Sequence, residues 1–323
     1  MRIIIPMAGL GTRLRPHTHT KPKPLLQVAG KTLLDHVLDR LDGLRIEEVV
    51  FIVGPFAQQV KQHVEAHYDF PARYVEQIEP KGQAHALYLA REHLVGTVFI
   101  IFVDTIFDAD LGFLEDASSD GVIFVKEVQD PSRFGVVTVE EGYITRFVEK
   151  PDEPISNLAI VGLYFVRNSA LLLECIEKVL AEGIKTKGEY YLADALQLMV
   201  DQGAKLETAT VDVWADCGKP ETLLTTNRYL LTKSGGTHGE TTNSVIVPPV
   251  HISSSASVTD SVIGPYVSIA GDVQIERSVL SDSIIDEGAR IENAVLRESL
   301  VGNRAEIRGR TLKVDIGDDS ILG

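Results

Sequence analysis

Short apolar runs alternate with segments of helical spacing through about the first 230 residues of the chain. Residues 3–7 and 49–53 are almost wholly apolar, as expected of strands that are buried on both faces of a sheet. Between these runs, leucine and valine recur every three or four residues, which predicts a helix over 33–41. Thr32 is a suitable N-cap for this helix, and Gly43 is a suitable stop.

The same alternation continues further along the chain. The pattern predicts a helix over 58–67, a strand near 72–75, a helix over 83–93 and a strand over 97–103. Strands that alternate with helices form mostly parallel sheets that helices cover. We therefore expect an α/β fold with a Rossmann-like, mostly parallel sheet, and a ligand outside the carboxyl ends of its strands.

The pattern changes after about residue 233. Residues 234–243 are polar and rich in glycine and threonine, which is typical of a linker. Beyond them an apolar residue recurs every five or six positions, and Tyr266 is the only aromatic residue. This period fits neither a helix nor a hairpin and is typical of a parallel β-helix. The recurring residues are Ile246, Ile252, Val258, Ile263, Ile269, Ile275, Leu280, Ile285, Ile291, Leu296, Val301 and Ile307.

These patterns predict two domains. We expect residues 1–233 to form the α/β domain, 234–243 to be a linker and 244–323 to form a left-handed parallel β-helix of hexapeptide repeats, in coils of roughly 18 residues. A chain of 323 residues is also long for a single hydrophobic core. An aromatic-poor β-sandwich is the alternative for the second domain.

Composition and charge narrow the class of protein. A hydrophobic content of 44% and a charged content of 24% are those of a soluble globular protein, and no apolar run is long enough to cross a membrane. The formal net charge of −15 argues against general nucleic-acid binding. Two cysteines lie far apart without metal or redox spacing, so we expect buried thiols in a cytoplasmic protein.

The charge is unevenly distributed. Residues 1–34 hold six Lys and Arg and no Asp or Glu, which indicates a site for a small anion. Gly9 and Gly11 follow the first strand, and without side chains their N–H groups can approach phosphate oxygens. Arg13 can grip a phosphate through two hydrogen bonds, and Lys23 adds a second positive charge.

The glycine pair belongs to neither of the commonest nucleotide-binding motifs. It lacks the third glycine of a dinucleotide fingerprint and the Gly-Lys-Ser/Thr ending of a Walker loop. Residues 9–23 instead resemble the signature of the sugar nucleotidylyltransferase family, Gly-x-Gly-Thr-Arg-Leu-x-Pro-x-Thr followed after four residues by a lysine. The resemblance continues over the first 230 residues or so. It implies that Arg13 and Lys23 are catalytic and bind a triphosphate, with Gly9 and Gly11 beside them.

A second segment resembles the part of the family that recognises the base. Residues 77–86 read Gln-Ile-Glu-Pro-Lys-Gly-Gln-Ala-His-Ala. The resemblance implies that Gln77 hydrogen-bonds the base and that the base ring packs on the backbone of Gly82. Taken alone, Gln77 would be an ordinary surface glutamine.

Two aspartates resemble the family's magnesium ligands. Asp104 ends an apolar run, where an unpaired buried carboxylate would be costly and a metal ligand would explain it. It matches the first ligand, although Val103 stands where the family usually has glycine. Asp216, in the run Trp-Ala-Asp-Cys-Gly, matches the second ligand. The resemblance therefore implies Mg²⁺ as the cofactor.

The resemblance also implies a site for a sugar phosphate, in segments 134–137, 147–151 and 156–164. Lys187 belongs to a Lys-Gly-Glu run where many relatives carry Arg-Gly-Glu, so it keeps the charge and loses the fork of the guanidinium. The resemblance implies that Gly135 contacts the sugar and that Glu149 binds its hydroxyls. Lys150 and Lys187 would bind its phosphate. Val161 and Tyr164 would line the wall of the sugar pocket.

These features predict an enzyme that transfers a nucleotidyl group from dTTP or UTP to a sugar-1-phosphate and releases pyrophosphate. Residues 149–165 most resemble glucose-1-phosphate thymidylyltransferases, which favours glucose-1-phosphate. Uridylyl transfer to the same sugar and guanylyl transfer to mannose-1-phosphate are alternatives, and a hexapeptide acyltransferase or an inactive regulatory subunit are alternatives of another class. The apolar β-helix also leads us to expect a homo-oligomer.

Overall fold

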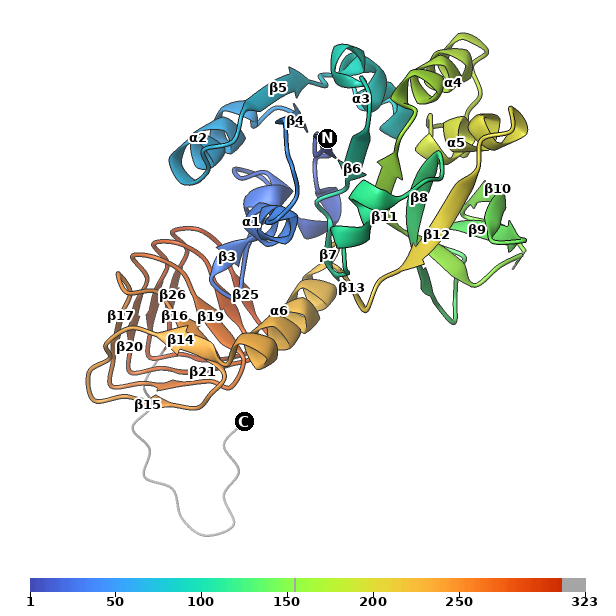
Figure 1. Cartoon of the computed structure of the whole chain (residues 1–323). Coiled ribbons are helices and arrows are strands. Elements are labelled where there is room, and N and C mark those ends of the chain that lie inside the picture. Colours follow the sequence, from blue (N-terminus) through green and yellow to red (C-terminus); the bar gives the residue numbers. More distant parts are fainter. Residues whose placement is uncertain (154, 310–323) are drawn as a thin grey trace. The chain divides into compact units, whose positions relative to one another are not determined.

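The computed structural model describes residues 1–153 and 155–309, which form two compact units (Figure 1). The first unit comprises Met1–Leu26 and Thr32–Lys219. The second comprises Gln27–Lys31 and the chain from Pro220 onward. Residues 310–323, the end of the predicted β-helix, lie outside the described residues.

A nine-stranded sheet forms the centre of the first unit. Its N-terminal strands pair in parallel in the order β5-β4-β1-β6, and β8 and β12 are also parallel. Strands β11, β10 and β9 pair antiparallel, so the parallel rhythm that the sequence predicts holds for the first half of the sheet. In sheet order the strands are β5 (Ala72–Glu76), β4 (Glu48–Val53), β1 (Arg2–Pro6), β6 (Val98–Ile101), β11 (Leu158–Val166), β8 (Gly121–Glu127), β12 (Leu206–Thr210), β10 (Tyr143–Glu149) and β9 (Gly135–Glu140).

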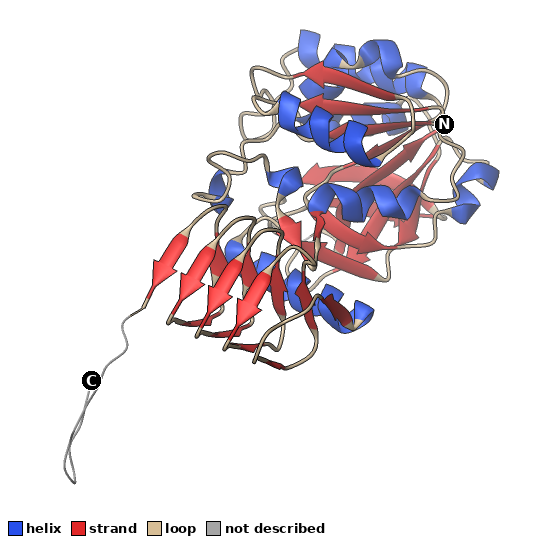
Figure 2. Ribbon diagram, turned by 90° about the vertical axis from the view of Figure 1, so that its left-hand side faces the viewer, coloured by secondary structure: helices blue, strands red, loops and turns tan. Residues whose placement is uncertain are grey.

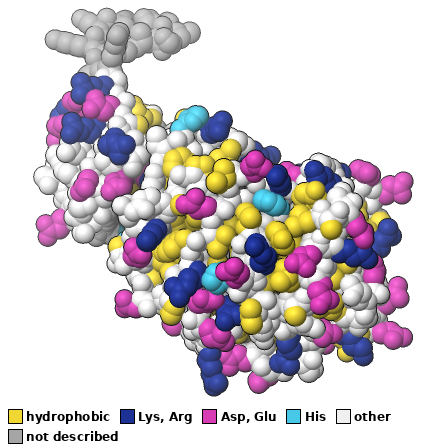
Figure 3. All heavy atoms as spheres, turned by 90° about the horizontal axis from the view of Figure 1, so that it is seen from above, with side chains coloured by type: hydrophobic (Ala, Val, Ile, Leu, Met, Phe, Trp, Pro, Cys, Tyr) yellow, Lys and Arg dark blue, Asp and Glu magenta, His cyan; other side chains and the backbone are white. Residues whose placement is uncertain are grey.

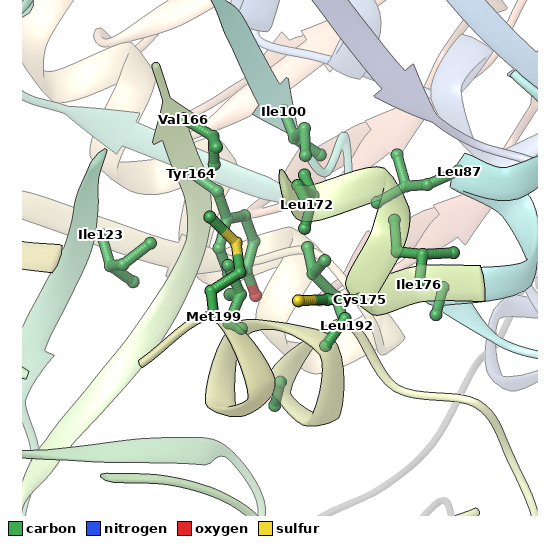
Figure 4. Packing of buried hydrophobic residues seen from close by; sticks show 14 of the residues in the cluster. Leu87, Ile100, Ile123, Tyr164, Val166, Leu172, Cys175, Ile176, Leu192 and Met199 are labelled. Atoms are coloured by element: carbon green, nitrogen blue, oxygen red, sulfur yellow. The ribbon is translucent and has the colours of Figure 1, made fainter. Parts of the chain in front are cut away.

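Helices cover both faces of this sheet, and the side chains of each strand alternate between them. Ile4 and Ile100 pack with α3 (Gln83–Leu89), α4 (Ser169–Ala181) and α5 (Leu192–Asp201), as the buried cluster in Figure 4 shows in part. The alternate residues of the same strands, Ile3, Ile5 and Phe99, pack with α1 (Leu33–Leu38) and α2 (Ala57–His67). The apolar runs of the sequence are therefore continuous because both sides of each strand are buried.

The predicted helix starts are confirmed. Thr32 caps α1 in a capping box, in which its side chain accepts from Asp35 N and the Asp35 carboxylate accepts from Thr32 N. The helix continues as a 3₁₀ turn, Asp39–Leu41, and the chain then turns at Gly43 with φ +87°. The helix expected over 83–93 divides in the same way, into α3 and a 3₁₀ turn at Arg91–His93.

The second unit contains the predicted parallel β-helix, whose strands Figure 2 shows stacked in successive turns. Three parallel sheets form its sides. The first holds β14 (Gly236–His238), β16 (Val250–Ile252), β19 (Val267–Ile269), β22 (Ile284–Ile285) and β25 (Leu300–Val301). The second holds β15 (Val245–Ile246), β18 (Val262–Ile263), β21 (Val279–Ser281) and β24 (Val295–Arg297). The third holds β17 (Ser257–Thr259), β20 (Gln274–Glu276), β23 (Arg290–Glu292) and β26 (Glu306–Arg308).

All twelve recurring apolar residues of the repeat belong to the core of this β-helix or pack against it. One turn is shorter than the expected 18 residues or so. Val250 pairs with Val267, 17 positions on, and Arg290 pairs with Glu306, 16 positions on. The predicted left-handedness of the β-helix stays a prediction.

The division between the units differs from the predicted domain boundary. Helix α6 (Pro220–Ser234) belongs to the second unit, together with the short strands β2 (Gln27–Val28) and β3 (Lys31–Thr32) up to Lys31. A buried polar contact joins these segments: Asn227, which is 0% exposed, accepts hydrogen bonds from Ala29 N and Ser268 Oγ and donates one to Tyr266 O. Part of the expected linker is also regular structure, because β14 pairs with β16.

No helix among the described residues is both long and apolar enough to cross a membrane. On the face of the molecule that Figure 3 shows, Lys and Arg side chains are interspersed with Asp and Glu, and neither sign of charge dominates.

Candidate active site

The glycine-bearing loop after β1 borders an open space at the carboxyl end of the strand. A Cβ on Gly9 would have no atom within 4 Å, so its backbone is accessible to a ligand. Gly11 has φ +59°, and a Cβ there would lie 3.1 Å from the Thr18 side chain and 3.2 Å from Cβ of Lys23. Thr18 Oγ1 donates to Gly11 O at 2.9 Å. The loop is therefore folded back so that the second glycine lies beside Lys23.

The two basic residues predicted for catalysis lie in short 3₁₀ turns: Arg13 in Thr12–Leu14, and Lys23 at the start of Lys23–Leu25. Lys23 is largely buried, with 12% of its side chain exposed, and its Nζ lies 3.7 Å from Asp104 Oδ2. A Cβ on Gly218 would lie 3.3 Å from Arg13 Nη2 and 2.8 Å from Asp216 Oδ1. The guanidinium of Arg13 and the carboxylate of Asp216 thus both lie close to Gly218.

A cavity of about 350 Å³ opens where the loops after β1, β5 and β6 meet. Seven of the residues predicted for nucleotide, catalysis or metal line it: Gly9, Gly11, Arg13, Lys23, Gln77, Gly82 and Asp104. Its apolar wall includes Pro80 and Phe102, and Glu189 adds a further carboxylate. Ligands of α/β sheets bind at such carboxyl ends where the strand order reverses, as it does here from β4-β1 to β1-β6.

Gln77 is a lining residue of this cavity and is not the surface glutamine that its type alone would suggest. Its side chain is largely buried, with the residue 6% exposed. Nε2 lies 3.4 Å from Gly82 O, to which it donates, and 3.1 Å from His85 Nδ1. Burial lowers the pKa of His85, which favours the neutral ring that can accept this hydrogen bond. The side-chain amide is therefore held in a fixed orientation at the cavity wall.

Two features call for glycine at position 82: the conformation of its backbone and its place in the wall of the cavity. Its φ is +117°, and a Cβ would lie 2.4 Å from Tyr190 O. Tyr190 N in turn donates to Lys81 O at 3.1 Å, and Ala84 N donates to Tyr190 O at 3.0 Å. Any side chain at this position would force the segment away from Tyr190.

The two predicted metal ligands, 112 positions apart in the sequence, are brought together by a two-stranded ladder. β7 (Thr105–Asp108) pairs antiparallel with β13 (Val213–Asp216), with Asp216 opposite Thr105. Cys217 N then donates to Asp104 O at 3.0 Å. Half of the Asp104 side chain is exposed and Lys23 lies beside it, so the cost of burying an unpaired carboxylate does not apply here, and the role of Asp104 as a metal ligand stays a prediction.

The residues predicted for the sugar form a second group. Gly135 and Glu149 face each other across β9 and β10, and a Cβ on Gly135 would lie 2.8 Å from Glu149 Oε2. Burial raises the pKa of Glu149, and the charge of Lys150, with Nζ 3.6 Å from Glu149 Oε1, opposes this effect. The absent side chain of Gly135 thus leaves room for the Glu149 carboxylate.

Lys150 is held from three sides. Besides Glu149, its Nζ donates to Tyr191 Oη at 2.7 Å and lies 4.9 Å from the centre of the Tyr191 ring. Its backbone has φ +47°, and its carbonyl oxygen accepts from Lys187 Nζ at 2.9 Å. Desolvation lowers the pKa of Lys150, but the hydrogen bond that Lys150 donates to Tyr191 and the charge of Glu149 outweigh it, and the pKa is raised. Lys187 also pairs with Asp152 at 3.3 Å.

Val161 and Tyr164, both on β11, lie in the hydrophobic core with 3% and 6% of their surface exposed. Figure 4 shows Tyr164 within the cluster that includes Leu172 and Met199. Burial is the main cause that raises the pKa of Tyr164, and the charges of Glu149 and Asp104 add to it. Neither Val161 nor Tyr164 is among the residues that line the cavity beside Lys23, so their predicted place in the wall of a sugar pocket stays a prediction.

Sequence reasoning missed Tyr191, Glu189 and Phe102. Tyr191 holds Lys150, Glu189 lines the cavity, and the charge of Glu189 adds to the raised pKa of Glu149. Phe102 also lines the cavity and packs edge-on against Tyr164, with ring centres 5.9 Å apart. Each of these residues adjoins a recognised motif, which is the only signal that the sequence offers for them.

The family of the chain follows from comparison with known proteins. Residues 2–233 match the family model described as nucleotidyl transferase. This match covers more than half of the chain, and the chain therefore belongs to the nucleotidyl transferase family.

Three relatives are informative. The chain is 36% identical to UTP–glucose-1-phosphate uridylyltransferase AglF of Haloferax volcanii, over 68% of this chain and 93% of that protein. It is 30% identical to a glucose-1-phosphate thymidylyltransferase of Streptomyces antibioticus, over 88% and 87% of the two chains. It is also 32% identical to the bifunctional protein GlmU of Methanocaldococcus jannaschii, over 72% of this chain and only 55% of that protein.

The fold is shared with solved structures. A crystal structure of UDP-glucose pyrophosphorylase complexed with UDP-glucose matches with a TM-score of 0.62 and 22% identity. The match covers 72% of this chain and 98% of the other. It confirms the fold of a nucleotidyltransferase domain.

Proposed function

We propose that this protein transfers a nucleotidyl group from dTTP or UTP to a sugar-1-phosphate, with glucose-1-phosphate the favoured acceptor, and releases pyrophosphate. The observation that carries the proposal is the cavity at the carboxyl ends of the first strands, where Arg13, Lys23, Gln77 and Asp104 converge. The names of the uridylyl- and thymidylyltransferase relatives support the same reaction class.

The reaction joins two anions, so the protein must neutralise charge and align its substrates. An oxygen of the sugar phosphate attacks the α-phosphorus of the triphosphate, and the bond to the pyrophosphate leaving group breaks. Arg13 and Lys23 stabilise the negative charge that grows on pyrophosphate. Lys150, held by Tyr191 and Glu149, binds the phosphate of the sugar. No general base is required because the attacking phosphate monoester is already ionised at pH 7.

A divalent cation, which we take to be Mg²⁺, fits the residues present. Among the described residues no group of three or more His, Cys, Asp and Glu side chains could hold a metal by itself. Two carboxylates, Asp104 and Asp216, suit Mg²⁺, which commonly takes one or two protein carboxylates and completes its shell with water and substrate phosphates. When bound, the ion would offset negative charge on the phosphate oxygens.

Gln77 bears on the choice of base through its side-chain oxygen. Because both N–H groups of Nε2 face Gly82 O and His85 Nδ1, Oε1 is the atom that can accept a hydrogen bond from the N3–H of thymine or uracil. The uridylyl- and thymidylyltransferase relatives support these two bases over adenine and cytosine, whose amino groups could also donate to this oxygen. The two buried thiols, Cys175 and Cys217, suit a reducing compartment, so we also propose that the protein acts in the cytoplasm.

A crossed panel of nucleoside triphosphates and sugar-1-phosphates, read by pyrophosphate release, tests the proposal. We expect the fastest release with dTTP or UTP and glucose-1-phosphate in the presence of Mg²⁺. A clear preference for ATP or GTP would refute the role given to Gln77 and leave the reaction class intact. No release with any pair would refute the reaction class and favour an inactive regulatory protein.

A further inference from the structure

His85 lies behind Gln77 and does not itself line the cavity. It is half-buried on the first turn of α3, and its Nδ1 lies 3.1 Å from Nε2 of Gln77. Gln77 directly follows β5 and forms part of the cavity wall. His85 can therefore act on a ligand in the cavity only through the side-chain amide of Gln77.

The carbonyl oxygen of Gly82 determines which end of this amide faces inward. It lies 3.4 Å from Gln77 Nε2, and a carbonyl oxygen accepts hydrogen bonds but cannot donate them. In the opposite orientation of the amide, two oxygens would face each other. The second N–H of Nε2 then points at His85 Nδ1, which must accept it. A histidine ring accepts at Nδ1 only when it is neutral and its proton is on Nε2.

The surroundings of His85 favour the neutral ring. Burial lowers the pKa of His85, the charge of Lys81 lowers it further, and the charge of Glu79 opposes both effects. Lys81 and Glu79 are themselves paired at 2.7 Å. A ring with a proton on Nδ1 would present an N–H to the N–H of Gln77 and would favour the reversed amide. The proton position on His85 therefore decides whether Gln77 offers the cavity an acceptor or a donor.

The oxygen of the Gln77 amide is open to a ligand. Oε1 has no hydrogen-bond partner in the part of the chain that the structure describes, and it is not closed off from solvent. Uracil and thymine carry a hydrogen on N3, which can donate to this oxygen. Cytosine has a lone pair on N3 and must shift to bring its amino group to the same oxygen. The observed orientation therefore suits uracil and thymine better than cytosine.

We propose that His85 is a positioning residue for the choice of base: it holds Gln77 with Oε1 toward the cavity and so favours a base with an N3–H over cytosine. This inference rests on the proposed nucleotidyl transfer and adds a residue that sets its specificity. Without the imidazole, only the 3.4 Å contact with Gly82 O holds the amide. The amide can then turn, and its two orientations suit the two kinds of pyrimidine.

The ratio of kcat/KM for UTP to kcat/KM for CTP tests the proposal, because these nucleotides differ only at this edge of the base. We expect His85→Leu to lower the ratio about tenfold, chiefly through a higher KM for UTP, since one hydrogen bond is no longer fixed. His85→Asn offers an amide oxygen near the place of Nδ1 and should restore most of the ratio. An equal loss for both nucleotides in His85→Leu would mean that His85 only supports the fold and would overturn the proposal.

His93→Leu is the matched control. It removes another half-buried imidazole, on the 3₁₀ turn after α3, whose Nδ1 lies 3.0 Å from Glu48 and which does not line the cavity. The ratio for UTP and CTP should stay at the wild-type value in this variant. A fall as large as that in His85→Leu would overturn the specific role of His85.

Two measurements without turnover separate this inference from the proposed reaction. Long-range proton–nitrogen NMR spectra of the free protein, with His85 assigned by its loss in His85→Asn, should show a neutral ring protonated on Nε2. A proton on Nδ1 overturns the proposal. Calorimetry of UTP and CTP binding measures base selection even if no pyrophosphate is released. A preference for UTP that His85→Leu removes supports the role of His85 whether or not transfer occurs, and an unchanged preference refutes that role while the reaction stands.

Discussion

The two units of this molecule are built from opposite kinds of sequence. In the first unit, the residues of the candidate site come from loops that lie far apart in the sequence, and each loop is different. In the second unit, one pattern of apolar and small residues repeats through four turns of β-helix, and no residue proposed for chemistry lies there. Irregular loops on a rigid sheet can place unlike groups around one point, whereas a repeat places like groups in rows.

The contrast predicts that catalysis depends on single residues of the first unit. Asp104→Asn and Asp216→Asn should each remove most of the activity, and chelation by EDTA should abolish it, because these are the two carboxylates proposed to hold the divalent ion. Pyrophosphate release measures the loss, with the exposed Asp69→Asn as a control of equal charge change. Unchanged Mg²⁺ dependence in Asp216→Asn would move the second ligand elsewhere.

The basic residues of the glycine loop should have the next largest effect. Lys23→Ala or Arg13→Ala should lower kcat about 10²- to 10³-fold, the usual loss when one preorganised charge is removed from a transition state. Lys61→Ala, which removes a half-exposed lysine paired with Glu65, should be close to wild type. Near-normal turnover in either loop variant would contradict the triphosphate assignment.

Truncation of the β-helix tests whether catalysis depends on the second unit. A chain that ends at residue 243 keeps every residue assigned to chemistry, so pyrophosphate release should stay measurable. It also leaves the buried side of α6, including Asn227, without the contacts of Tyr266 and Ser268, so the melting temperature should fall. A chain that ends at Lys219 also removes α6 and should recover part of this loss. Complete inactivity of a folded truncation would show that the β-helix helps to build the site.

A smaller effect is expected from Tyr191, the residue that holds Lys150. Tyr191→Phe keeps the ring beside the ammonium and removes the 2.7 Å hydrogen bond. It should raise KM for the sugar-1-phosphate about tenfold and leave KM for the triphosphate unchanged, since one hydrogen bond to a charged group is lost. Tyr190→Phe removes the neighbouring hydroxyl as a control. An equal rise in both KM values would mean that Tyr191 only supports the fold.

The smallest expected effect is a change in the pH profile. The raised pKa of Glu149 means that this carboxylate gains its proton at a higher pH than an ordinary glutamate, so sugar binding should weaken early on the acid side. The same shift makes its contribution to folding stability decline as the pH rises through this pKa. Glu149→Gln should flatten the acid limb of kcat/KM. An acid limb that persists in the variant would assign it to another group.

The sequence predicts the parts of this molecule where a local pattern decides the structure. Thr32 caps its helix, and the apolar residues of the β-helix repeat face its core, because both depend on neighbours at fixed spacing. The glycine loop, Gln77 and Asp104 also meet as expected, since loops at the carboxyl ends of adjacent parallel strands must converge.

Other features depend on contacts that spacing does not encode. Helix α6 looks like the end of the first domain, and it is contacts distant in sequence, such as those of Asn227 with Ala29 and Ser268, that assign it to the second unit. The exposure of Asp104 depends on where its strand ends, and the hydrophobic pattern of the sequence does not define that end well. In the sequence, Tyr191 looks like any other core aromatic residue, because only the fold brings Lys150 beside it.

The central claim is that the α-phosphorus of a nucleoside triphosphate is attacked by a sugar phosphate. Incubation with dTTP or UTP labelled separately at the α- and γ-phosphates, with glucose-1-phosphate and Mg²⁺, tests this most directly. We predict that the α label moves into a nucleoside diphosphate sugar while the γ label appears in pyrophosphate. A γ label released as orthophosphate, or an α label that stays in the nucleotide whatever the sugar, would contradict the account.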